Sequence, residues 1–127
     1  MFFIEPMSRT PIYEQLVIQL EAFILSGALQ PGEQIPSVRG LSLQLSINPN
    51  TIQKAYSEMD SRGLIHSVPG KGCFITENAF SHLQARAAQK LDVLDSLIAE
   101  LILGGISREQ ILARIDAIFQ AKGGTIS

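Results

Sequence analysis

The chain lacks the features of an exported or membrane-spanning protein. It has one cysteine, Cys73, among 127 residues, so an internal disulfide framework is excluded and a reducing compartment is expected. No stretch approaches the roughly 20 apolar residues that a membrane-spanning helix needs. Residues 1–4 are apolar, but Glu5 follows at once and no basic segment precedes them, unlike a secretory signal. We therefore expect a soluble, cytoplasmic protein with no membrane partner.

Patterns typical of catalysis and of metal binding are also missing. His66, His82 and Cys73 do not have the spacing of metal ligands, and Cys73 is predicted to be a small, buried apolar side chain. The acidic residues are scattered along the chain. The Gly-Lys-Gly run at residues 70–72 lacks the remaining glycine and hydroxyl of a phosphate-binding loop. We expect no enzyme activity, no metal and no cofactor.

Charge is sparse and nearly balanced. Ten Lys and Arg residues stand against twelve Asp and Glu residues, which gives a net charge of −2, and 17% of residues are charged. Hydrophobic residues make up 46% of the chain, as in a packed, folded protein rather than a disordered tail. Overall charge therefore gives no attraction to nucleic acid, and binding to DNA would have to depend on where the charges lie.

The N-terminal part of the chain predicts a helix and then a very short strand. Thr10 is expected as the N-cap and Pro11 as the first helical residue, and Gly27 ends the helix. A Pro-Gly turn then leads to a strand at residues 34–35. The apolar side chains that recur at helical spacing in this helix are Ile12, Leu16, Leu20, Phe23 and Ile24.

Two short helices joined by a tight turn follow. Ser37 is expected to cap the first, which turns Val38, Leu41 and Leu45 inward. Asn48 caps the second, Pro49 takes its first position, and Gly63 follows its end. The residues expected in the buried stripe of the second helix are Ile52, Ala55, Tyr56 and Met59. Those expected on its exposed polar face are Asn50, Gln53, Lys54 and Ser57.

Beyond Gly63 the pattern changes from helix to strand. Residues 64–68 and 73–76 are short runs typical of β-strands, separated by a glycine-rich tip that carries Lys71. The order helix, strand, helix, turn, helix, hairpin is that of a winged helix-turn-helix. We therefore predict a mainly α protein with a small β-hairpin (α+β), whose residues 1–77 form the winged helix-turn-helix domain.

The last third of the chain, residues 78–127, predicts a helical dimerisation region. From about residue 79 to residue 103, apolar residues follow a spacing close to a heptad repeat. Gly104 and Gly105 end this helix, and the run at residues 107–110 predicts a capping box that opens a final helix. The alternative is a helix pair packed on its own domain. The residues expected at the dimer interface are Leu83, Ala87, Leu91, Leu94, Ile98, Leu101, Ile115 and Ile118.

The strongest functional pattern lies around the second helix of the helix-turn-helix. Short polar residues such as Asn48, Asn50 and Thr51 near a helix N-terminus suit insertion into the major groove of DNA. Four basic residues and two acidic ones lie between residues 36 and 72, which gives a local charge of +2 (four minus two). They are Arg39, Lys54, Arg62 and Lys71 against Glu58 and Asp60.

These motifs together resemble those of a known family. Residues 29–39 resemble the opening signature of GntR-family transcription regulators, residues 48–56 their recognition helix, and residues 63–65 and 69–75 their wing. The resemblance covers roughly residues 10–76. The short helical C-terminal region is similar to that of the YtrA-like subfamily. The sequence departs from the family pattern at Gly40, usually acidic, at Ser46, usually glycine, and at Cys73, usually a small hydroxyl residue.

The resemblance implies a bacterial repressor that binds a palindromic operator as a homodimer, with the recognition helix in the major groove and the wing at the minor groove. It also leaves open a small-molecule effector of unknown identity that binds between the subunits. The residues expected to bind DNA are Ser37, Arg39, Asn48, Asn50, Thr51, Gln53, Lys54, Gly70, Lys71 and Gly72.

Two alternatives come from the acidic overall balance and from the fold. A winged helix can also be an adaptor that docks on another protein, and the apolar excess of the C-terminal helices fits that interpretation. Arg39 can likewise be an ion-pair partner inside the fold rather than a DNA contact.

Overall fold

The computed structural model describes residues 1–122, so residues 123–127, the end of the predicted dimerisation region, lie outside the described residues. The chain divides into two compact units, Met1–Arg86 and Ala87–Ser127. Helix α4 (Ala79–Leu103) contributes its first two turns to the first unit, where Ala79 and Leu83 are buried in the core. The first unit therefore extends beyond the predicted boundary between residues 77 and 78.

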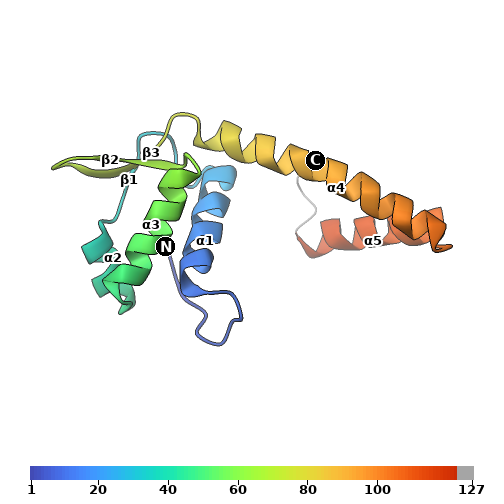
Figure 1. The fold of residues 1–127 in the computed structure, drawn as a ribbon, viewed down its shortest axis with the longest axis horizontal. Helices are drawn as coiled ribbons and strands as arrows, with labels where there is room; N and C mark the ends of the chain where they lie inside the picture. Colours follow the sequence, from blue (N-terminus) through green and yellow to red (C-terminus); the bar gives the residue numbers. More distant parts are fainter. Residues whose placement is uncertain (123–127) are drawn as a thin grey trace. The chain divides into compact units, whose positions relative to one another are not determined.

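The first unit is a winged helix-turn-helix, as the sequence predicts (Figure 1). The elements before α4 are α1 (Ile12–Ser26), β1 (Gln34–Ile35), α2 (Val38–Leu45), α3 (Pro49–Ser61), β2 (Ile65–Val68) and β3 (Gly72–Ile75). The three strands form one antiparallel sheet in the order β1-β3-β2, in which Ile35 pairs with Cys73 and Ile65 with Ile75. Strands β2 and β3 are the wing.

The core of this unit lies where α1, α2, α3 and the sheet meet. Leu16 and Leu20 of α1 are fully buried in the same core as Ile52 and Met59 of α3. Removing each such side chain from water contributes about 1.5–3 kcal/mol to folding. The predicted buried stripe of α3, which also includes Ala55 and Tyr56, is confirmed. One face of α3 is therefore packed in the core, and the opposite face is exposed to solvent.

The start of α1 differs from the prediction by one residue. Pro11, not Thr10, is the N-cap, and it makes no side-chain capping bond. The carboxamide of Gln15 instead binds the chain before the helix: its Nε2 donates to the carbonyls of Glu5 and Thr10, and its Oε1 accepts from the Glu5 amide. Because these bonds join residues up to ten positions apart, they are not visible in the local pattern.

The caps and the turn between α2 and α3 follow the sequence prediction. Ser37 Oγ accepts a hydrogen bond from the Gly40 amide at 2.9 Å, and Asn48 Oδ1 accepts one from the Asn50 amide at 2.8 Å. Ser46, in this turn, has a left-handed backbone with φ of 56°. The turn is therefore made by a residue type for which this conformation has a steric cost.

The second unit consists of the rest of α4, a turn at Gly104 and Gly105, and α5 (Arg108–Ala121). Ser107 and Gln110 form the predicted capping box at the start of α5. Among the described residues of this unit, 87–122, none is buried. Between its helices runs an apolar groove of about 430 Å³, to which Leu94, Leu97, Ile98, Leu101, Ile106, Gln110, Ile111, Arg114, Ile115 and Ile118 contribute. Within residues 1–122, no helix combines the length and apolarity needed to cross a membrane.

The left-handed backbone of Ser46 gives the first testable prediction. Ser46→Gly should raise the free energy of unfolding by about 0.5–1 kcal/mol, because the relief of steric strain exceeds the entropy lost by a glycine on folding. Denaturant unfolding followed by circular dichroism measures it. As a matched control, Ser61→Gly in the last turn of α3 should instead lower stability by about 0.5 kcal/mol. Destabilisation by both changes would contradict the assigned turn.

Candidate nucleic-acid interface

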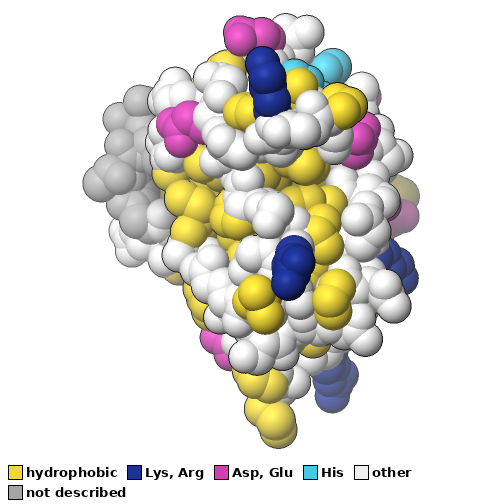
Figure 2. Space-filling model, turned by 90° about the vertical axis from the view of Figure 1, so that its left-hand side faces the viewer, with side chains coloured by type: hydrophobic (Ala, Val, Ile, Leu, Met, Phe, Trp, Pro, Cys, Tyr) yellow, Lys and Arg dark blue, Asp and Glu magenta, His cyan; other side chains and the backbone are white. Residues whose placement is uncertain are grey.

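The candidate interface is the face of the first unit that carries α2, the exposed side of α3 and the tip of the wing. Figure 2 shows the side with α2 and the hairpin tip, where lysine and arginine side chains stand singly among hydrophobic and uncharged ones. A continuous basic patch is not seen on this face. Recognition here therefore has to depend on the placement of a few charges and on polar contacts.

The exposed face of α3 presents short and medium polar side chains in successive turns. Asn50, Gln53 and Lys54 are exposed, as predicted. Gln53 Nε2 donates to Ser57 Oγ at 3.3 Å, one turn further along the same face. The Asn48 cap uses only its carbonyl oxygen, so its amide hydrogens can still donate. Such carboxamides can pair with the edge of a base in the major groove.

Arg39 lies in the first turn of α2 and Ser37 is its N-cap, and α2 packs against α3. Arg39 is exposed and makes no ion pair with any of residues 1–122, so the structure does not support the alternative that it is an internal ion-pair partner. The Ser37 hydroxyl accepts the capping hydrogen bond from Gly40 and keeps its own hydrogen to donate. Both side chains can thus reach an anionic partner without loosening the helix.

The wing is braced by a residue that the local sequence pattern does not predict. Gln34 of β1 donates a hydrogen bond from Nε2 to the carbonyl of Lys71, at 2.8 Å and across 37 positions of the chain. Gly70 and Gly72 on either side of Lys71 have φ of 76° and 122°, which L side chains rarely adopt. A Cβ at Gly72 would clash with Gln34 Nε2. The exposed Lys71 is therefore held on a braced tip.

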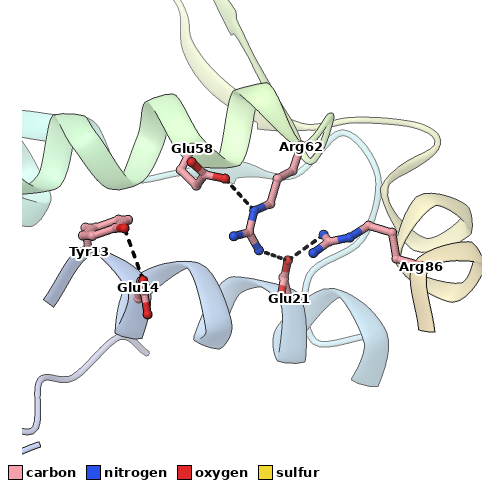
Figure 3. A network of polar contacts seen from close by, with 6 residues as sticks. All are labelled: Tyr13, Glu14, Glu21, Glu58, Arg62 and Arg86. Atoms are coloured by element: carbon pink, nitrogen blue, oxygen red, sulfur yellow. Dashed lines mark hydrogen bonds and ion pairs between the residues drawn. The ribbon is translucent and has the colours of Figure 1, made fainter. Parts of the chain in front are cut away.

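Arg62, one of the four basic residues counted between residues 36 and 72, is held in ion pairs. Its Nε donates to Glu58 Oε2 at 2.8 Å and its Nη1 to Glu21 Oε2 at 2.8 Å, while Arg86 Nη1 also donates to Glu21 Oε2 at 3.0 Å (Figure 3). The hydrogen bond to Glu58 is the main reason that the pKa of Arg62 is raised. These pairs join α3, α1 and the first turns of α4, which leaves Arg39, Lys54 and Lys71 as the cations of the interface.

Tyr56, on the buried face of α3, ties this helix to the chain before α2. Its hydroxyl donates to the carbonyl of Pro36, in the connection between β1 and α2. Burial first, and then the proximity of Cys73, raise the pKa of Tyr56 well above that of a free phenol, so the hydroxyl stays a donor. Cys73 itself is half-buried, and its Sγ lies 3.4 Å from Ser67 Oγ. Among residues 1–122 there is no group of three or more side chains suited to hold a metal ion.

The brace on the wing is tested by a double-mutant cycle. Gly72→Ala should displace the Gln34 carboxamide and break the hydrogen bond from Gln34 to Lys71. The loss in free energy of unfolding caused by Gly72→Ala should therefore be smaller by about 1 kcal/mol when Gln34→Ala is already present. Thermal and denaturant unfolding of the four proteins measures this coupling. Gly70→Ala is the control, since a Cβ there meets nothing within 4 Å, and its cost should not depend on residue 34. An equal cost of Gly72→Ala in both backgrounds would refute the brace.

Comparison with known proteins gives the family. The family model described as "Bacterial regulatory proteins, gntR family" matches residues 12–75. The HTH-type transcriptional repressor YtrA of Bacillus subtilis is 37% identical over 123 residues, which cover 95% of each chain. The match to YtrA over both units confirms the predicted similarity to the YtrA-like subfamily.

Solved structures agree with this assignment. A transcriptional regulator from Oenococcus oeni has a TM-score of 0.71 and 37% identity, covering 91% of this chain and 96% of that one. The DNA-binding domain of AraR in complex with operator ORX1 has a TM-score of 0.52 and 32% identity, covering 59% of this chain and 93% of that one. These relatives are transcription regulators rather than enzymes. The chain therefore belongs to the GntR family of DNA-binding transcription regulators.

Proposed function

We propose that the protein is a repressor that binds a palindromic operator as a homodimer, in the cytoplasm, where the chromosome lies. The observation that carries this proposal is the exposed polar face of α3, fixed from behind by a fully buried apolar face and flanked by the braced wing. YtrA, which is similar along nearly its whole length, is described as a repressor, and AraR was solved bound to an operator.

In this proposal α3 enters the major groove by its N-terminal turns. Asn50, Thr51 and Gln53 are the side chains that reach base edges, because carboxamides and hydroxyls match the donor and acceptor patterns exposed there. Asn48, beside them, donates from its free amide hydrogens. The positively polarised start of α3 favours the approach of the phosphate backbone.

The three interface cations are assigned to the flanks of the duplex. Arg39 approaches a base edge or a phosphate from α2, and Lys54 approaches a phosphate from α3. Lys71, between Gly70 and Gly72, approaches the minor groove or its phosphates, since glycine allows the backbone to come close. A chain with net charge −2 thus uses locally placed cations rather than overall charge to bind DNA.

The homodimer is proposed from the second unit, whose two helices have no buried residue of their own among residues 87–122. Leu94 is 42% exposed, Leu97 51% and Ile118 60%. A surface of this apolarity is unusual on an isolated soluble unit, and a second copy is the occupant that also supplies the symmetry of a palindrome. Leu83, expected at this interface, is covered within its own unit, so the proposal rests on Ala87, Leu91, Leu94, Ile98, Leu101, Ile115 and Ile118.

We infer that an effector would bind in the groove between α4 and α5. The groove is lined mostly by apolar side chains, with two polar ones, Gln110 and Arg114. An apolar site with few polar groups suits an amphipathic small molecule, bound between the subunits, where it would shift the dimer between two arrangements. A thermal-shift screen in which no small molecule stabilises the dimer would count against this inference.

The proposed function predicts specific retardation of DNA from upstream of the chain's own coding sequence. In gel-shift titrations at two salt concentrations, binding should be nanomolar and exceed that of an unrelated fragment, and protection should cover two half-sites about 10 base pairs apart, or a multiple of this. Equal, weak binding to both fragments would contradict an operator at that position. Capture of a protein partner with no retardation of any promoter DNA would favour the adaptor alternative.

Two alanine variants serve as controls for this titration. Lys71→Ala should weaken binding to both fragments. It should also reduce the salt slope, which is the steepness with which the logarithm of the binding constant falls with the logarithm of the salt concentration, by about 1, as expected for a lost phosphate contact. Arg39→Ala should weaken binding by about 1–3 kcal/mol on the specific fragment if it contacts a guanine edge. Unchanged affinity in both variants would remove these two residues from the interface.

The dimer is tested by a charge in the groove. Leu94→Glu should give monomers with weakened operator affinity, because a carboxylate cannot be buried against the second copy without a partner. Analytical ultracentrifugation measures the mass. Leu103→Glu is the matched control, since Leu103 is 89% exposed and lies outside the groove; this variant should remain dimeric. A dimeric Leu94→Glu protein would place the interface elsewhere.

A further inference from the structure

One contact beside the recognition helix is explained neither by the core nor by the assigned base contacts. Lys54 of α3 places its Nζ 4.1 Å from the centroid of the Tyr13 ring on α1. Tyr13 is half-buried and its ring packs against the core, whereas Lys54 is exposed. A half-buried aromatic ring on one helix therefore lies against an exposed cation on another.

The hydroxyl of Tyr13 is already occupied. It donates to Glu14 Oε1 at 3.2 Å (Figure 3), and this hydrogen bond is the main reason that the pKa of Tyr13 is raised. The group stays a neutral phenol in this setting. What Tyr13 offers to Lys54 is thus the face of its ring, whose negative quadrupole attracts an ammonium group.

The position of the ammonium matters because of what lies beside it. Lys54 shares a shallow surface hollow with Asn50 and Thr51, one turn earlier on α3, and with the start of α1. Gln53, the adjacent residue, points about 100° away around the helix and binds Ser57 instead. The two neighbours are therefore directed to different sides of α3.

From this geometry we propose that Tyr13 is a positioning residue for DNA binding: its ring holds the Lys54 ammonium on the α1 side of the recognition helix, where Lys54 contacts a phosphate while Gln53 is left to read base edges. The inference rests on the proposed operator binding. A free lysine loses much rotamer freedom when it is fixed by a ligand. A ring that restrains the side chain beforehand reduces that loss and raises affinity.

The proposal gives Tyr13 a signature that a purely structural role would not have. Since the ring acts and the hydroxyl does not, Tyr13→Phe should bind as the wild type does. Tyr13→Leu should weaken binding about two- to fivefold, the factor expected for an exposed cation–π contact. Because phosphate contacts carry no sequence information, the loss should be equal on specific and unrelated duplexes.

The experiment uses a duplex that the full-length wild-type protein selects from a random-sequence pool, with an unrelated duplex as the second probe. Dissociation constants are measured by fluorescence anisotropy at several salt concentrations for the wild type, Tyr13→Phe, Tyr13→Leu, Lys54→Met and the Tyr13→Leu/Lys54→Met double variant. Lys54→Met should reduce the salt slope by about 1, whereas Tyr13→Leu should leave the slope unchanged. In the Lys54→Met background, Tyr13→Leu should have no further effect.

The outcomes separate this inference from the function on which it rests. If the wild type selects no sequence, operator binding and the inference fall together. If the wild type selects a duplex and Tyr13→Leu binds it equally well, the inference alone is overturned. It is also overturned if Tyr13→Leu weakens binding by the same factor in the wild-type and Lys54→Met backgrounds, because the ring would then act through the fold. Thermal melts of each variant show whether Tyr13→Leu lowers the stability of the fold in the two backgrounds.

Discussion

The burial of one whole face of α3 is the constraint on which the rest of the interface depends. Ile52, Ala55 and Met59 are fully buried in the core that α3 shares with α1 and the sheet. A helix with 3.6 residues per turn that is fixed in this way must turn its other face to water. Tyr56 adds a hydrogen bond from the same helix to the connection before α2. The angle at which α3 presents its polar residues is thus set by the packing of its opposite face.

Charge is sparse on the candidate interface. The chain is slightly acidic, and one of its central cations, Arg62, serves to join α3 to α1 through Glu21. The three cations of the candidate interface, Arg39, Lys54 and Lys71, stand on α2, on α3 and on the wing. In the proposed binding mode, three separated charges each need to be held in place, which gives a physical reason for the brace of Gln34 on the wing and for the ring of Tyr13 beneath Lys54.

Most elements of the fold could be predicted from the sequence because their signals are local. Ser37, Asn48 and Ser107 cap helices within three residues of their own position, and the glycine-rich wing is read from consecutive residues. The side chains that position the interface could not be predicted in this way. The bonds of Gln34 to Lys71 and of Arg62 to Glu21 span 37 and 41 positions. They depend on which elements the fold brings together, so the local sequence pattern does not reveal them.

The most direct test of the account is a titration of isotope-labelled protein with its selected duplex, followed by the backbone amide signals in NMR spectra. If the exposed face of α3 is the reading surface, the largest changes should fall on Asn50, Thr51, Gln53 and Lys54 and on the wing tip around Lys71. The buried stripe of α3 and the groove between α4 and α5 should change little at the same ratio of DNA to protein. Changes concentrated in that groove, with α3 and the wing unaffected, would contradict the account.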